Sequence, residues 1–208
     1  MFDGRHEFVI GPLSGCRQTG RSPILPLMVF RRSILIFILA VSTATAGDPP
    51  SFHGRQRSFT TITPVTEAPI TPMHTERGGI TDLTRYRGRV VLLNLWATWC
   101  AACLRELPDL DQLQVELGGD DFTVVTLSLD SEGLKLVQPY FARLGITNLP
   151  AHTDPAGRAA EAFGVREGLP WSFVIDRQGR VRGYLMGAAD WNSAEARALL
   201  THYISGKP

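Results

Sequence analysis

The sequence has few cysteines, little net charge and no apolar run of the length that usually crosses a membrane. Its 208 residues include three cysteines, 21 Lys or Arg and 20 Asp or Glu. Three cysteines cannot form the several disulfides that hold small exported scaffolds together. A net charge of +1 offers no electrostatic basis for binding nucleic acid or an anionic membrane surface. The 44% hydrophobic content is nevertheless enough for an ordinary globular core.

The N-terminal residues 1–46 have the pattern of an extension followed by an export signal. Arg31 and Arg32 precede an apolar segment, and Ala44-Thr45-Ala46 closes it, as in a secretory signal peptide. Residues 33–46 would form a helix of about 21 Å, shorter than the roughly 30 Å hydrocarbon core of a bilayer. Length therefore favours cleavage, with a short anchor as the alternative. We predict a periplasmic protein that loses Cys16 when the signal is removed.

The remaining chain divides into a tether and one domain. Prolines recur between residues 49 and 72, so we predict a flexible tether over 47–60 and an irregular lead-in over 61–80. The domain itself is predicted over 61–208, and we expect a monomer. Apolar runs predict strands at 90–96, 122–129, 149–153, 172–176 and 181–185. Helical periodicity predicts helices at 101–117, 132–144, 158–163 and 193–203. This order predicts an α/β fold, with a mixed sheet and helices on both faces.

Cys100 and Cys103 form a C-x-x-C pair where a buried strand leads into a helix. The first turn of a helix has unpaired N–H groups and the positive end of the helix dipole, which stabilise a thiolate at Cys100. Cys103 lies one helical turn further on, close enough to form or resolve a disulfide. The pair can therefore attack a disulfide through Cys100 and release the reduced partner through Cys103.

Other uses of the pair remain open at this level. A zinc site needs about two further ligands, and a copper site would need the dithiol and a distant histidine, with His152 as the first choice. The available histidines are scattered without metal spacing: His53, His74, His152 and His202. A purely structural disulfide is a third alternative. A strand that leads directly into C-x-x-C at a helix start favours a redox dithiol, so we predict no metal and no cofactor.

Several motifs occur together around the pair. They are Trp96-Ala97-Thr98-Trp99-Cys100-Ala101-Ala102-Cys103 with Glu106 and Pro108, then Gly168-Leu169-Pro170, and then residues 173–176. This combination resembles the TlpA/ResA-like branch of the thioredoxin superfamily and is most similar to the TlpA type. The resemblance covers about residues 80–208 and implies a thioredoxin fold. The segments 132–144 and 149–153 resemble the insert that separates this branch from minimal thioredoxins.

The resemblance also implies roles for residues beside the dithiol. Pro170 is expected to be a cis-proline, which exposes the backbone of Leu169 to an extended substrate segment. Trp99 and Trp171 border the same surface, so we include them among the substrate-binding residues. Where the family commonly has threonine after the cis-proline, this chain has Trp171, and where it commonly has proline before the second cysteine, it has Ala102. Both positions border the active site, so these two departures bear on which partner the protein binds and on the redox potential of the dithiol, and not on the class of reaction.

Glu106 is the predicted proton acceptor. Thioredoxin buries an aspartate at the strand position that Asn94 occupies here, whereas the TlpA/ResA-like branch uses a glutamate three residues after the second cysteine. Helical geometry points the same way, because residues 103, 106 and 110 share one side of the helix and Leu110 is apolar. A partly buried carboxyl has a raised pKa and can take the proton of Cys103. A solvated surface glutamate is the alternative.

The predicted function is therefore that of an extracytoplasmic thiol–disulfide oxidoreductase. The resemblance implies a reductant of disulfides in protein partners, in the assembly of cytochrome oxidase copper sites or in cytochrome c maturation. A membrane electron donor would have to reduce the pair again. The alternatives are a disulfide-forming oxidant, a peroxidase of the related peroxiredoxin branch and a copper-binding chaperone. The C-x-x-C pair argues against the peroxidase.

Overall fold

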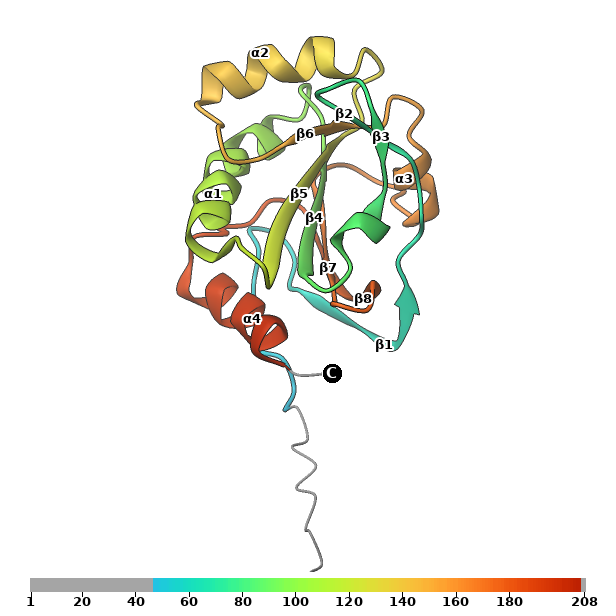
Figure 1. Cartoon of the computed structure of the whole chain (residues 1–208). Helices are drawn as coiled ribbons and strands as arrows, with labels where there is room; N and C mark the ends of the chain where they lie inside the picture. The colour runs from blue at the N-terminus through green and yellow to red at the C-terminus, as the bar shows by residue number, and fades with distance from the viewer. Residues whose placement is uncertain (1–46, 207–208) are drawn as a thin grey trace, which may run out of the picture. The chain divides into compact units, whose positions relative to one another are not determined.

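The computed structural model describes residues 47–206, in which one eight-stranded sheet lies between two groups of helices (Figure 1). The strand order is β1-β8-β7-β4-β5-β6-β2-β3. The strands are β1 (Thr60–Glu67), β2 (Met73–Thr75), β3 (Ile80–Thr81), β4 (Val90–Trp96), β5 (Phe122–Ser128), β6 (Ala151–Thr153), β7 (Trp171–Ile175) and β8 (Arg180–Met186). The helices are a 3-10 turn η1 (Leu83–Tyr86) and α1 (Ala101–Leu117), α2 (Leu134–Leu144), α3 (Arg158–Ala162) and α4 (Ala194–Ser205).

The sheet is mixed, as the sequence predicted. Strands β4, β5 and β6 run parallel, whereas β7 pairs antiparallel with both β4 and β8. Every residue of β4, β5 and β7 is buried, because helices cover the centre of the sheet on both faces. By contrast, β8 alternates buried and half-buried residues, as expected nearer an edge. The predicted α/β fold with a helix-flanked mixed sheet is therefore confirmed.

Two hydrophobic clusters fill the space on either side of the sheet. One joins alternate strand residues such as Leu92 and Val124 to α1, α2 and α4. The other joins the intervening residues, such as Leu93 and Val125, to α3 and η1. Both cysteines of the C-x-x-C pair belong to the first cluster, so the reactive pair lies on the α1 face of the sheet.

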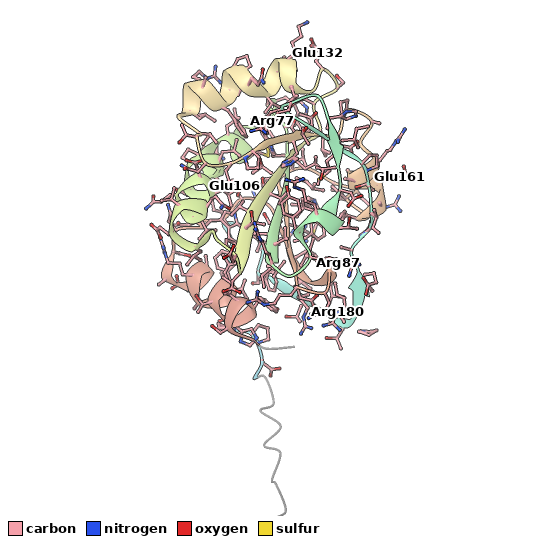
Figure 2. The ribbon with its side chains drawn as sticks, in the orientation of Figure 1. Arg77, Arg87, Glu106, Glu132, Glu161 and Arg180 are labelled. Carbon is pink, nitrogen blue, oxygen red and sulfur yellow. A yellow bond between two sulfur atoms is a disulfide. The ribbon has the colours of Figure 1, made fainter. Side chains whose placement is uncertain are left out.

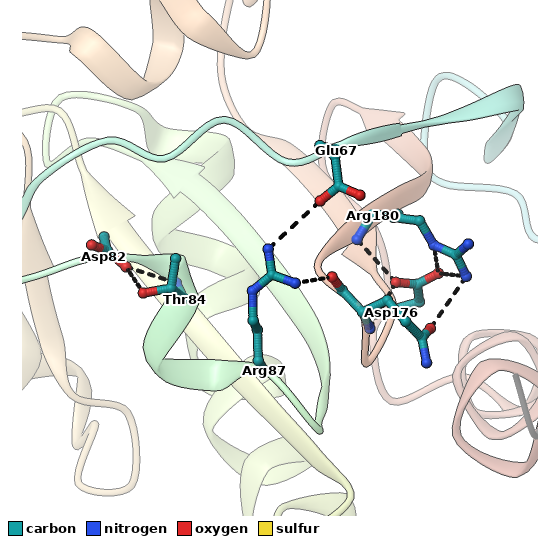
Figure 3. Close-up of polar contacts among 7 residues, drawn as sticks. Glu67, Asp82, Thr84, Arg87, Asp176 and Arg180 are labelled. Carbon is teal, nitrogen blue, oxygen red and sulfur yellow. Dashed lines mark hydrogen bonds and ion pairs between the residues drawn. The ribbon is translucent and has the colours of Figure 1, made fainter. Parts of the chain in front are cut away.

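The predicted elements agree closely with the structure from residue 90 onward. Helix α1 has the predicted bounds and continues past Pro108 to Leu117. The β7–β8 turn is held by Asp176, whose carboxylate accepts the N–H groups of Gln178 and Arg180 at 3.0 and 2.9 Å. Figure 3 shows this turn together with Arg87, which pairs with Glu67 of β1 at 3.7 Å and donates to the carbonyl of Gln178.

The prediction of an irregular lead-in over 61–80 was wrong, since β1, β2 and β3 form there. Pro64 falls between Thr61 and Thr66, where the β1–β8 register shifts, and β1 is an edge strand. A proline is tolerated at such a place because no ladder hydrogen bond needs its missing N–H.

The segment predicted as a tether, 47–60, also contains packed residues. The side chain of Phe52 is 2% exposed and belongs to the core cluster on the α1 face, because it finds an aromatic partner far along the chain, Trp191. The predicted signal peptide, the short-anchor alternative and Cys16 lie outside the described residues. Within residues 47–206, no helix combines the length and the apolar character needed to cross a bilayer.

Candidate active site

The two cysteines lie where β4 ends and α1 begins. Cys100 is the N-cap of α1, and its Sγ accepts the N–H of Cys103 at 3.1 Å. The two sulfurs form a disulfide with the Cα atoms 5.3 Å apart. Cys100 is 7% exposed and Cys103 is fully buried, whereas the neighbouring Trp99 is 70% exposed. Cys100 is therefore the cysteine that a partner can reach, and Cys103 is placed behind it.

Glu106 lies in the interior, not at the helix surface. It belongs to α1 (Figure 2), is 2% exposed, and both carboxylate oxygens are hydrogen bonded. Asn94 of β4 donates to Oε1 at 2.7 Å, and the backbone N–H of Ala189 donates to Oε2 at 3.0 Å. The indole N–H of Trp191 faces the same carboxylate but falls short of hydrogen-bonding geometry. The alternative of a solvated glutamate is excluded by this burial.

The environment of Glu106 sets its proton affinity. Burial raises its pKa from 4.5 to about 7, because the charged form loses its water. The N–H of Ala189, the amide of Asn94 and the indole of Trp191 lower the pKa, and the nearby charge of Asp109 raises it. A carboxyl with a pKa near neutrality can take up and release a proton readily near neutral pH.

The loop before β7 approaches the disulfide. The Leu169–Pro170 peptide bond is cis, and the carbonyl oxygen of Leu169 lies 3.4 Å from Cys100 Sγ. A cleft of about 140 Å³ beside this loop is lined by Gln56, Arg57, Glu167, Gly168, Leu169, Pro170, Trp171, Met186 and Gly187. The structure thus brings three of the four predicted substrate-binding residues to one cleft, and Trp99 lies beside Cys100.

Trp171 supports the loop from within. Its side chain is 9% exposed and stacks on Phe173 and Tyr184, with ring centroids 5.9 and 5.4 Å away. Its indole N–H donates to the carbonyl of Glu167 at 3.0 Å. Most of Trp171 therefore fills space under the cleft, and only a small part of its side chain is exposed.

Sequence reasoning missed two contributions to the site. Asp130, after β5, accepts the N–H and the hydroxyl of Thr98 at 2.9 and 2.6 Å and so holds the loop that leads to Cys100. Gln56 and Arg57 reach the cleft from the N-terminal segment. The position of Asp130 directly after a buried strand is a sequence pattern that could have indicated its place near the site. No local signal marked residues 56 and 57, because their place depends on folding back over β8.

His152, the first choice for a copper ligand, contacts a residue on the other face of the sheet from the dithiol. It is 4% exposed, and its Nε2 lies 3.2 Å from the hydroxyl of Tyr86, which packs on the face of the sheet opposite α1. Burial lowers its pKa. Among residues 47–206, no three His, Cys, Asp or Glu side chains gather in a way that could hold a metal ion.

Comparison with known proteins supports the same chemistry. Residues 64–184 match the AhpC/TSA family, a span that contains Cys100, Cys103, Glu106 and Pro170. The chain is 28% identical over 160 residues to the thiol-disulfide oxidoreductase ResA of Geobacillus kaustophilus, which covers 77% of this chain and 87% of that protein. It is 33% identical over 105 residues to ResA of Geobacillus thermodenitrificans, covering 50% of this chain and 59% of that protein.

Solved structures agree in fold. A thiol:disulfide interchange protein of the thioredoxin family from Chlorobium tepidum is 28% identical with a TM-score of 0.56, covering 69% of this chain and 99% of that one. The exposed lipoprotein thioredoxin of Streptococcus pneumoniae is 30% identical with a TM-score of 0.52, covering 62% and 98%. The chain is therefore a thiol–disulfide oxidoreductase of thioredoxin fold that is similar to the ResA proteins, and it belongs to the AhpC/TSA family.

Proposed function

We propose that this protein reduces disulfides of partner proteins outside the cytoplasm, using Cys100 as the nucleophile and Cys103 as the resolving thiol. The observation that carries the proposal is the disulfide at the start of α1, in which Cys100 is slightly exposed and Cys103 is fully buried, with the buried Glu106 on the same helix. A structural disulfide would need neither the exposed Trp99 beside it nor a cis-proline loop within 3.4 Å of Cys100 Sγ.

The reaction starts from the dithiol form. The Cys100 thiolate attacks one sulfur of the partner, which breaks the partner disulfide, forms a mixed disulfide and releases one partner thiolate. Cys103 then gives its proton to the Glu106 carboxylate and attacks Cys100 Sγ. This second step forms the Cys100–Cys103 disulfide and releases the second partner thiolate. The partner gains two electrons, and an external donor must return two electrons to the protein.

The cleft at the cis-proline is the proposed docking site for the partner. An extended segment lies along Leu169 and pairs with its backbone, which brings the partner disulfide to Cys100. Pro170 keeps the loop in this form, Trp99 provides an exposed apolar surface beside the cysteine, and Trp171 holds the loop in place. At about 140 Å³ the cleft is smaller than the pockets that enclose drug-sized ligands, which are typically about 300–1,000 Å³.

Direction, location and partners rest on resemblance. The similarity to the TlpA type favours a reductant with partners in copper-site assembly or cytochrome c maturation, and a membrane electron donor. The signal-like pattern of residues 1–46 and the similarity to an exposed lipoprotein thioredoxin favour a place outside the cytoplasm. We propose that the protein acts as a monomer and without a cofactor.

Covalent trapping tests the reaction directly. Cys103→Ser cannot resolve the mixed disulfide, so we expect a partner to remain attached to Cys100 and to separate from it on addition of dithiothreitol. Cys100→Ser is the matched control and should trap at least tenfold less. Mass spectrometry of the trapped species identifies the partner and its cysteine. Equal trapping by both variants, or no adduct in cells that express Cys103→Ser, contradicts the proposal.

A second measurement tests the direction. The fraction of dithiol is measured in glutathione mixtures of known potential, and the proposed reductant should remain mostly oxidised at the potential of the glutathione pool. A pair that is mostly reduced there would be a disulfide-forming oxidant instead. The redox state of the trapped partner in cells without this protein gives the same distinction independently.

A further inference from the structure

Residues 52–59 form a folded arm in front of β1. The N–H of Gly54 donates to the carbonyl of Arg57, and the N–H of Phe59 donates to the carbonyl of Phe52, each at 2.8 Å. His53 and Ser58 also form a bridge between the two sides of the arm. These bonds close a short loop, so a contact at its tip is linked through the backbone to the contact made by Phe52.

The arm lies against the loop that precedes α4, residues 188–191. The N–H of Arg55 donates to the carbonyl of Ala188 at 2.9 Å. A Cβ at Gly54 would lie 3.1 Å from the same carbonyl and 2.9 Å from the side chain of Leu185, so a larger residue there would crowd this contact. The ring of Phe52 packs on that of Trp191, with centroids 5.2 Å apart. Neither ring is more than 2% exposed.

The opposite side of the same loop faces Glu106. The N–H of Ala189 donates to Glu106 Oε2 at 3.0 Å, and the indole of Trp191 faces the carboxylate. Ala188 and Ala189 are adjacent, so one of them bonds to the arm and the next bonds to the proton acceptor. The loop is therefore held between the arm and the active site.

We propose that the arm is a positioning element of the active site, in which Phe52 keeps the 188–191 loop closed over Glu106 and excludes water from its carboxylate. This inference rests on the proposed role of Glu106 in proton transfer. The arm comes from the part of the chain that follows the predicted export signal, so the residues next to that signal would help to tune the dithiol.

The sign of the expected effect follows from the groups around Glu106. Loss of water is the largest influence on its pKa and raises it, whereas the Ala189 and Asn94 hydrogen bonds lower it by less. Opening the loop admits water and removes the Ala189 bond, so the net effect is a lower pKa. Asp109 in α1 is the charged group that acts on Glu106, and Asp190 of the loop and Arg55 of the arm act in turn on Asp109. Cys103, one turn earlier in α1, is held in the disulfide, and β4 contributes only the neutral Asn94.

The test follows the titration of Glu106 in the oxidised protein, where the cysteines do not titrate. The amide resonance of Ala189 reports the charge of the carboxylate it bonds. We expect Phe52→Ala to move the titration midpoint down by about one pH unit or more, a tenfold loss of proton affinity. Phe52→Leu, which keeps an apolar side chain, should restore most of the shift. Gly54→Ala, which pushes the arm away and keeps Phe52, should lower the midpoint as well.

Two controls separate packing from other causes. Phe163→Ala removes an aromatic ring that lies 4.6 Å from Phe173 on the other face of the sheet, so it should leave the midpoint unchanged. Arg55→Gln removes the charge and keeps the backbone bond to Ala188, so it should not lower the midpoint. An unchanged midpoint in folded Phe52→Ala and Gly54→Ala proteins overturns the proposal.

The experiment also distinguishes this inference from the proposed function. If Glu106→Gln leaves the pH–rate profile of the dithiol unchanged, the role of Glu106 in proton transfer fails. The titration of Glu106 in the Phe52→Ala protein still shows whether the arm controls its environment. If Phe52→Ala moves the titration midpoint of Glu106 but leaves the pH–rate profile of the dithiol unchanged, the arm is only a structural neighbour of Glu106. Its proposed role in the active site is then refuted.

Discussion

Glu106 should make the oxidised protein less stable as the pH rises. Its pKa is 4.5 in an unfolded chain and about 7 in the folded one. Between these values the folded protein holds a proton that the unfolded chain has released, so the contribution is fully present below pH 4.5 and is lost as the pH rises through about 7. At about 1.4 kcal/mol for each pKa unit, the free energy of unfolding falls by about 3 kcal/mol across this window.

Glu106→Gln isolates this effect, because it removes the charge and keeps the shape. The new amide can donate to Asn94 Oδ1, which has no hydrogen-bond partner in the structure, once the Asn94 amide turns over. Denaturant unfolding of both oxidised proteins at pH values from 4 to 8 gives the difference in free energy. Other groups, including the buried His152, titrate in both proteins and cancel in that difference.

The expected result is a difference between the two proteins that grows in favour of the glutamine variant by about 3 kcal/mol from pH 4.5 to pH 8. Circular dichroism at each pH confirms that both proteins begin folded. If the free energies of unfolding of the two proteins depend on pH in the same way, the reasoning is refuted. That result would mean that the hydrogen bonds of the Glu106 carboxylate stabilise its charge as much as the loss of hydration destabilises it.

Further predictions concern the surroundings of the site. The carboxylate of Asp111 accepts hydrogen bonds from the N–H groups of residues 147, 148 and 149. Asp111→Ala should therefore reduce the free energy of unfolding by about 2 kcal/mol. A loss below about 0.5 kcal/mol in urea unfolding contradicts this prediction. Asp130→Ala should slow the attack of the reduced protein on a model disulfide roughly tenfold, since the loop before Cys100 loses its anchor; stopped-flow kinetics measures the rate. A side chain at Gly183 would lie 2.6 Å from the carbonyl of Thr60, so Gly183→Ala should lower the melting temperature, whereas Gly119→Ala, with nothing within 4 Å, should leave it unchanged.

The reactive pair and its helix could be read from local patterns. The apolar run of β4, the C-x-x-C pair and the leucine spacing of α1 all lie within residues 90–117, so neighbours in sequence were enough to predict the bounds of the helix. The same reasoning placed Glu106 on the inner side of α1, because helical periodicity alone decides which residues share a face.

Only the tertiary structure decided what surrounds Glu106. Asn94 and Ala189 lie 12 and 83 residues away in sequence, and no periodicity links them to the helix. The strands β1–β3 escaped prediction for a related reason: they are short or interrupted by proline, and they become strands only when β8 and β6 provide partners. Phe52 was assigned to a tether because its partner, Trp191, is known only once the chain has folded back. The sequence alone determined the position of the proposed nucleophile, Cys100, because the C-x-x-C pair and the helix start are local features. The environment of the proposed proton acceptor, Glu106, depends on long-range packing, because a carboxyl loses its water only when distant segments meet around it.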